Sequence, residues 1–188
     1  MKHLVVIMIL FAFLISGCSN GSDSKEAKAK REAIVKAEEV MKRAWAEVVT
    51  NGQRLLDITY PLIDEIKPMI GIDEKLLLRL VEARSTLVSL GTIKSGDPVQ
   101  NDLDAYQTAQ NKVLQILLEI AGDSVVKEAA TSNQSLQELL MQIEATHNRI
   151  KIARMDYNQA VVSYNLKSGE HRTIFKADPD YKKTDVRF

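Results

Sequence analysis

Hydrophobic side chains recur along this chain at alternating steps of three and four residues, and the recurrence marks four segments. These segments cover residues 34–66, 76–90, 103–120 and 136–164, and the first is the least regular. An average step of about 3.5 residues is typical of amphipathic helices that pack nearly parallel to one another. Because no segment alternates with the period of two that a half-buried strand needs, the pattern predicts an all-α fold.

Capping residues and helix breakers set the expected ends of the first two helices. The first helix is expected over about 25–69, with a kink near Tyr60 because Pro61 removes a backbone donor. The second is expected to begin after Asp73, whose side chain can cap free N–H groups. It is expected to end at Gly91.

The last two helices have equivalent signals. Asp97 followed by proline predicts an N-cap for the third helix, over 98–122. The fourth is expected to start at one of two capping boxes, 131–134 or 135–138, and to run to about residue 166.

These four helices predict an elongated antiparallel bundle with long first and last helices, because short connections place sequence neighbours side by side. The bundle is expected to occupy residues 25–166, and the charged residues 167–188 form an irregular C-terminal tail. The alternative is an open coiled-coil hairpin that completes its core with another subunit, which would make the protein a homo-oligomer.

The N-terminal residues resemble a bacterial lipoprotein signal. An apolar run over 4–15 would span about 18 Å as a helix, well short of a ~30 Å hydrocarbon core. It is followed by Ile-Ser-Gly17-Cys18, which is similar to the lipobox that is cut before a lipidated cysteine. We therefore expect a signal peptide at 1–17, cleavage between Gly17 and Cys18, and a flexible tether at 18–24.

The expected compartment and partners follow from this anchor and from the charge balance. Lipid chains on Cys18 would hold the chain to a membrane on its extracytoplasmic side. Ser19 favours the outer membrane in a two-membrane cell, and a single-membrane cell would carry the chain on its outer face. The expected mature chain has nearly equal numbers of acidic and basic side chains, so a nucleic-acid partner is not expected. With a single cysteine there is no intramolecular disulfide.

The last segment also resembles the signature of the LemA family. The family pattern there reads as a leucine-rich stretch, an N-R-I run, an A-R pair and two Y-N pairs seven residues apart. In this chain these positions are Asn148-Arg149-Ile150, Ala153-Arg154, Tyr157-Asn158 and Tyr164-Asn165, with Ala44-Trp45-Ala46 matching earlier. The resemblance implies a membrane-attached helical bundle of the cell envelope without an established catalytic activity. The hydrophobic tail common in the family is absent from 167–188.

Eight residues are candidates for contacts with a partner or ligand. They are Trp45, His147, Arg149, Arg154, Tyr157, Asn158, Tyr164 and Asn165. The two tyrosines are expected in the core and the two asparagines are expected to bond across helices. Arg154 lies on the hydrophobic seam, so its charge must either reach solvent or be paired. The pairing group would be a carboxylate from Glu47, Glu65, Glu82 or Glu119, or an anionic ligand.

Enzymatic chemistry is not expected. Glu144 and His147 form a single E-x-x-H step, whereas a di-iron bundle uses two such steps with further glutamates. Neither a nucleophile elbow nor a phosphate-binding loop is present. The leading hypothesis is a non-catalytic lipoprotein that acts through contacts with an unidentified envelope protein, with no cofactor or metal. The second is a small-ligand sensor with polar groups between the helices, and an enzyme is the weakest.

Overall fold

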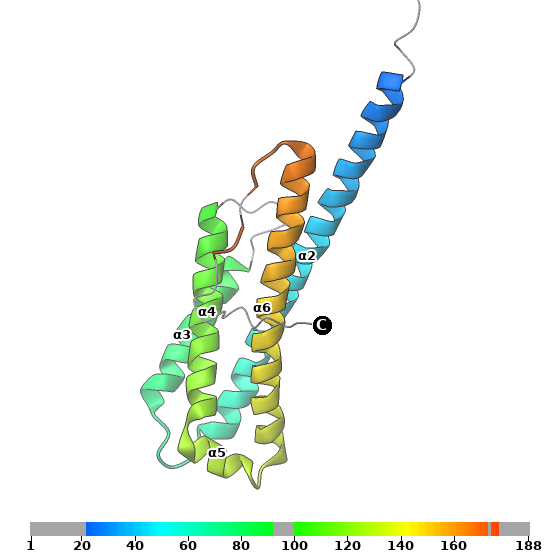
Figure 1. Ribbon diagram of the computed structural model, residues 1–188. Helices are drawn as coiled ribbons and strands as arrows, with labels where there is room; N and C mark the ends of the chain where they lie inside the picture. Colours follow the sequence, from blue (N-terminus) through cyan, green and yellow to red (C-terminus); the bar gives the residue numbers. More distant parts are fainter. Residues whose placement is uncertain (1–21, 92–99, 173, 177–188) are drawn as a thin grey trace, which may run out of the picture.

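The computed structural model describes residues 22–91, 100–172 and 174–176, and all regular secondary structure in these ranges is α-helical (Figure 1). The helices are α2 (Ser22–Ile66), α3 (Glu74–Leu90), α4 (Gln100–Gly122), α5 (Ser124–Ala130) and α6 (Gln134–Ser168). The predicted all-α class is therefore confirmed.

The four long helices pack as two pairs that lie against each other. The most extensive contacts join α2 to α6, and the next most extensive join α3 to α4. The helices of each pair run in opposite directions, and the short α5 lies across one end (Figure 1). At the other end α2 projects beyond α6. Its side chains from residue 25 to 36 are exposed except for half-buried Ile34, and the first fully buried one is Ala37.

The predicted hydrophobic seam forms the core. Nearly every seam position on the three later helices is buried, including the polar positions Gln110 and Arg154. His147 and Leu140 are exceptions on α6, since both are only partly buried. The periodicity therefore identifies the inward face of each helix, because burial follows the 3.6-residue turn.

Several predicted helix ends are confirmed. The Asp73 carboxylate caps α3 by accepting from the N–H of Lys75 at 2.9 Å, and Gly91 ends that helix. Gly122 is the last residue of α4. Gly169 closes α6 with φ +78°, a left-handed conformation that favours glycine. The predicted start of the third helix at Asp97 lies outside the described residues.

Three expectations about the elements are corrected. Asn133 caps α6 by accepting from the N–H of Leu136 at 3.1 Å, so neither predicted capping box starts the helix. α5 was not predicted, although Asp123 caps it with two hydrogen bonds. α2 begins at Ser22, within the residues expected to form the tether, and ends at Ile66 rather than near residue 69, because Pro68 cannot extend the helix.

Candidate functional site

The chain after α6 turns back and packs on the bundle instead of leaving it. Gly169 reverses the direction, and the following residues run back along α6 toward α4 (Figure 1). We call the described residues of 169–176 the C-terminal strap. Phe175 in the strap is only 2% exposed, so this part of the predicted irregular tail belongs to the folded core.

Three side-chain amides hold the backbone of the C-terminal strap. Asn165 accepts from the N–H of Arg172 at 2.9 Å and donates to its carbonyl at 3.0 Å. Asn158 binds Phe175 in the same two-way manner, at 2.8 and 3.1 Å. Gln107 on α4 does so with Lys176, at 3.3 and 3.1 Å. Each amide therefore satisfies one donor and one acceptor of an extended segment, as a neighbouring β-strand would.

The spacing of the two asparagines matches the spacing of their targets. Seven residues along an α-helix advance about 10.5 Å, and three residues of extended chain advance about 10 Å. Asn158 and Asn165 are seven apart, while Arg172 and Phe175 are three apart. The prediction that the asparagines bond across helices is therefore wrong, because both bond to the C-terminal strap.

Aromatic rings fill the space beneath the C-terminal strap. The ring of Phe175 stacks on Trp45, with centroids 6.2 Å apart, and meets the edge of Tyr157 at 5.5 Å. Trp45 also contacts Tyr106 and Tyr157, at 5.8 and 5.5 Å. Tyr157 lies in the core as predicted, and this ring cluster joins α2, α4 and α6 to the strap.

Arg154 lies beside this ring cluster, and its guanidinium binds α4. It donates to Oε1 of Gln110 at 3.1 and 2.5 Å and to Oδ1 of Asn111 at 2.8 Å. It also lies 5.6 Å from the ring centroid of Phe175. Two of the carboxylates predicted as its partners are engaged elsewhere, since Glu65 accepts from Asn133 at 2.8 Å and Glu119 pairs with Arg79 at 3.3 Å.

The second Y-N pair repeats this arrangement closer to the end of α6. Tyr164 is buried, and its hydroxyl donates to Glu170 of the strap at 3.0 Å. Arg172 donates to the same hydroxyl at 3.4 Å and lies 4.7 Å from the ring centroid. Each Y-N pair therefore supplies one ring to the core and one amide to the strap.

Next to the ring cluster, α2 and α4 approach each other closely at Gly52 and Tyr106. A Cβ atom at Gly52 would lie 2.1 Å from the hydroxyl of Tyr106, so any other residue there would require Tyr106 to move. The Tyr106 phenol is buried, which raises its pKa to about 12, and the nearby positive charge of Arg154 opposes that rise. These residues therefore bring α2 and α4 close together beside the ring cluster.

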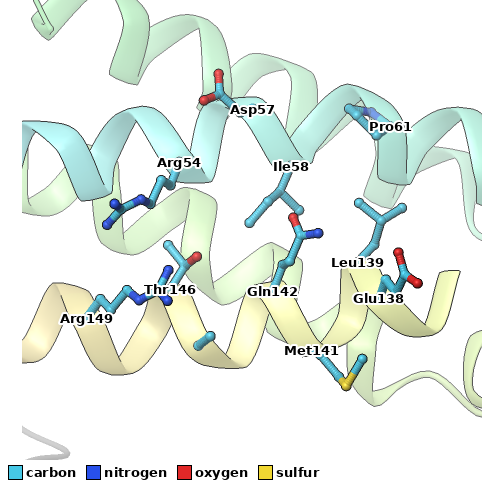
Figure 2. A pocket seen from close by; sticks show the side chains of 11 residues that line it. Arg54, Asp57, Ile58, Pro61, Glu138, Leu139, Met141, Gln142, Thr146 and Arg149 are labelled. Carbon is cyan, nitrogen blue, oxygen red and sulfur yellow. The ribbon is translucent and has the colours of Figure 1, made fainter. Parts of the chain in front are cut away.

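An accessible groove lies between α2 and α6, away from the strap. Its volume is about 730 Å³. Figure 2 shows Ile58 of α2 and Leu139 and Gln142 of α6 pointing toward one another across it. Arg54 and Arg149 line it from the two helices, and Asp57, Pro61, Glu138, Met141, Ala145 and Thr146 complete its lining. A second cavity of about 350 Å³ also includes Arg54 and Arg149.

The predicted contact residues lie in two places, the strap and the groove, except His147, which lies in neither. The strap and the rings under it involve Trp45, Arg154, Tyr157, Asn158, Tyr164 and Asn165. Arg149 belongs to the groove. His147 lies partly buried on α6, and neighbouring Glu144 is exposed. The predicted lipidation site at Gly17 and Cys18 lies outside the described residues.

Sequence reasoning missed Phe175, Gln107 and the groove. A lone aromatic residue in a charged tail carries no period, so no pattern marked Phe175 as a core residue. The repeat of Asn158 and Asn165 beside the seam was a usable signal, because two amides on one helix edge suit an extended backbone.

Two further properties concern the described part of the chain. None of its helices is both long and apolar enough to cross a membrane. Its histidine, aspartate and glutamate side chains form no cluster of three or more that could hold a metal ion.

Comparison with known proteins identifies the family of this chain. No curated protein matches the chain. The model of the LemA family matches residues 44–178, which span α2 from Ala44, the helices α3 to α6 and the C-terminal strap. Because this match covers well over half of the 188 residues and includes both Y-N pairs and their strap, the chain belongs to the LemA family.

Proposed function

We propose that this LemA family protein is a non-catalytic lipoprotein of the bacterial cell envelope that acts through protein contacts, as a scaffold or signalling accessory. In this proposal its long helices form an antiparallel four-helix bundle, and lipidated Cys18 holds the bundle on the extracytoplasmic side of a membrane. That side is the periplasmic face of the outer membrane in a two-membrane cell and the outer face of the plasma membrane otherwise.

The groove between α2 and α6 is the observation that supports this proposal most. It combines apolar side chains at its centre, such as Ile58 and Leu139, with the guanidinium groups of Arg54 and Arg149. Protein-binding surfaces commonly have an apolar centre with polar groups around it, and arginine is frequent in them. A segment of another protein with apolar residues and a carboxylate would complement this surface.

The projecting end of α2 also supports an anchored protein. Residues 25–36 carry almost only exposed side chains and precede the first core residue, Ala37. Twelve residues of helix span about 18 Å, so this part of α2 would hold the bundle away from the lipid headgroups. The groove would then be open to other envelope proteins.

The groove is tested by crosslinking in native membranes followed by mass spectrometry of the co-purified proteins. We compare the natural chain with a double variant, Arg54→Glu with Asp57→Lys, because both side chains are exposed on α2 and line the groove. Arg43→Glu is the control, since it reverses an exposed charge on the same helix outside the groove. The proposal predicts a partner that the double variant loses and the control keeps. A partner set that is unchanged in all three chains would contradict it.

The anchor is tested separately by Cys18→Ser. Only a thiol accepts the diacylglycerol, so the variant should show no lipid labelling and should accumulate as an uncleaved precursor. A variant that is processed normally and stays bound to the membrane would contradict lipidation at this residue.

A small anionic ligand in the same groove is the second candidate. A volume of about 730 Å³ falls within the range of small-molecule sites, and two guanidinium groups line the groove. The predicted sensor residue Arg154 is instead buried under Phe175. Thermal unfolding with added phosphate or citrate distinguishes this candidate. A rise in Tm that Arg54→Glu abolishes and Arg43→Glu keeps would favour it.

A further inference from the structure

The outward face of α6 carries a second hydrophobic pattern that the bundle does not use. Eight exposed positions follow one another at alternating steps of four and three residues, and six of them are apolar. We call them the α6 stripe: Met141, Ala145, Asn148, Ile152, Met155, Gln159, Val162 and Leu166. Ile152 is 58% exposed and Leu166 is 82% exposed.

The α6 stripe lies opposite the core side of the helix. Residues 143, 150, 157 and 164 are buried in the bundle and also repeat every seven residues. The stripe also repeats every seven residues, and the buried residues lie half a helix turn away from it, on the opposite face of α6. Figure 2 shows Met141 pointing away from α2, whereas Leu139 points toward it. Two apolar faces on one helix indicate that α6 packs on two sides.

We propose that the α6 stripe binds the same stripe of a second copy of this chain as a parallel two-stranded coiled coil. In heptad terms Ala145, Ile152, Gln159 and Leu166 occupy the a positions, and the other four residues occupy the d positions. In parallel pairing each residue meets its own equivalent. Asn148 and Gln159 therefore meet amides rather than apolar side chains, and such polar pairs fix the register of coiled coils.

The charges beside the α6 stripe favour parallel pairing of two identical helices. In a parallel dimer the g position of one helix lies near the following e position of the other. Glu144 then meets Arg149 of the second copy, and Lys151 meets Asp156 of the second copy. The two-fold symmetry doubles both contacts, so four opposite-charge pairs form and no like-charge pair does.

An antiparallel arrangement fits these charges less well. Its e positions pair with e positions and its g positions with g positions. With Ile152 opposite Met155 of the second copy, Arg149 can meet Asp156. Lys151 and Glu144, however, face Asn158 and Asn165, which bind the C-terminal strap. A parallel dimer also directs both projecting α2 ends the same way, toward one membrane.

The C-terminal strap explains why the charged positions lie in one half of the stripe. Asn158 and Asn165 are the next g positions along α6, and their amides hold the strap backbone. The strap therefore borders the second half of the stripe, while Glu144, Arg149 and Asp156 are exposed beside the first half. Met141, Ala145 and Arg149 also line the α2–α6 groove, so the dimer and a partner in the groove would share these three residues.

Charge reversal with rescue tests the proposal on the full lipidated chain in density-matched detergent, by sedimentation equilibrium. Glu144→Lys with Lys151→Glu turns all four pairs into like-charge pairs, and we expect a dimer roughly tenfold to a hundredfold weaker. Adding Arg149→Glu and Asp156→Lys restores opposite charges in parallel pairing, and we expect the natural affinity to return.

Single cysteines test the direction of the helices. Residues at an a position approach their equivalents closely enough for a disulfide in a parallel dimer. Ala145→Cys and Gln159→Cys, placed two heptads apart, should therefore each give crosslinked dimers on oxidation. The parent chain and Leu78→Cys, which is exposed on α3, should not.

Three outcomes would overturn the proposal. The first is a chain that stays monomeric in sedimentation equilibrium, which would mean that something other than a second copy, such as residues 177–188 or lipid, covers the stripe. The second is a dimer that the first charge reversal leaves unchanged. The third is a dimer in which neither Ala145→Cys nor Gln159→Cys crosslinks, which would indicate antiparallel helices or another face.

Discussion

Asn158 shows how one side chain joins the C-terminal strap to α6. Its amide makes both hydrogen bonds to the backbone of Phe175, which leaves neither group of that peptide unpaired in the interior. When one partner of a buried hydrogen bond is removed, the other partner stays buried without a hydrogen bond, which destabilises the folded state.

We therefore predict that Asn158→Ala lowers the free energy of unfolding by about 1–3 kcal/mol, as measured by urea denaturation. Gln137→Ala is the matched control, because Gln137 is an exposed amide side chain on the same helix. A control that loses as much stability as Asn158→Ala would show that the strap contacts contribute nothing.

Gly52 and Tyr106 form a second contact, in which glycine leaves room for the Tyr106 hydroxyl. Gly52→Ala places a Cβ atom on the Tyr106 hydroxyl, and we expect a loss of about 1–3 kcal/mol in unfolding free energy. Adding Tyr106→Phe removes the hydroxyl, so the double variant should recover part of that loss in a double-mutant cycle. Gly122→Ala is the control, because nothing lies within 4 Å of its added Cβ. Purely additive effects of the two substitutions would contradict the contact.

The buried phenol of Tyr106 predicts a dependence of stability on alkaline pH. Burial raises its pKa to about 12 from the ordinary 10.0, so the folded state holds the proton more tightly than the unfolded state. This contribution is complete below pH 10 and is lost as the pH rises from 10 to 12.

The natural chain should therefore lose about 2–3 kcal/mol of unfolding free energy relative to Tyr106→Phe over that interval. Denaturation curves at successive pH values measure it. A constant difference would show that the phenol is solvated in the folded protein.

At the scale of elements, the sequence predicts helices better than it predicts what joins them. The seam on α3, α4 and α6 was predictable because the bundle buries one stripe of each helix. α5 has only seven residues, too few to show a period, and its cap at Asp123 is the only local signal. The C-terminal strap has no hydrogen-bonded repeat of its own, so its position depends on amides that are distant in the sequence.

Phe175 anchors the C-terminal strap, and its truncation should release that element without unfolding the helices. Phe175→Ala removes a ring that contacts Trp45 and Tyr157. We expect faster amide hydrogen exchange at Arg172 and Phe175, with exchange in the centre of α2 unchanged. Ile174→Ala, which truncates a 41% exposed neighbour, is the control. Equal exchange in the two variants would contradict an anchoring role for the ring.

The candidate site, like the fold, was predictable only in part. Most of the signature residues of α6 lie together beside the strap, because the Y-N repeat lies at the edge of the core seam. The groups that they bind were not identified, because these are backbone N–H and C=O groups, which do not depend on the residue type. The α2–α6 groove was not predicted because exposed residues such as Arg54 and Gln142 follow no hydrophobic period.

In the molecule as a whole, the C-terminal strap, the groove and the α6 stripe have different proposed roles, and the groove and the stripe meet at Met141 and Ala145. The C-terminal strap lies at the same end of the bundle as the projecting part of α2 (Figure 1). The groove lies between α2 and α6, and the α6 stripe lies on the outward side of α6. A lipid anchor before α2 would leave both the groove and the stripe accessible.

Site-specific photo-crosslinking in intact cells measures directly whether this protein acts through contacts at the groove. A photoreactive residue is placed either at Ala145, which lines the groove, or at Gln115, which is exposed on α4. Because Ala145 also belongs to the α6 stripe, adducts to a second copy of this chain are counted separately by mass. We predict an adduct to a different envelope protein from Ala145 that Arg54→Glu with Asp57→Lys abolishes, and none from Gln115. Equal adducts from both positions, or no foreign adduct from either, would contradict the account.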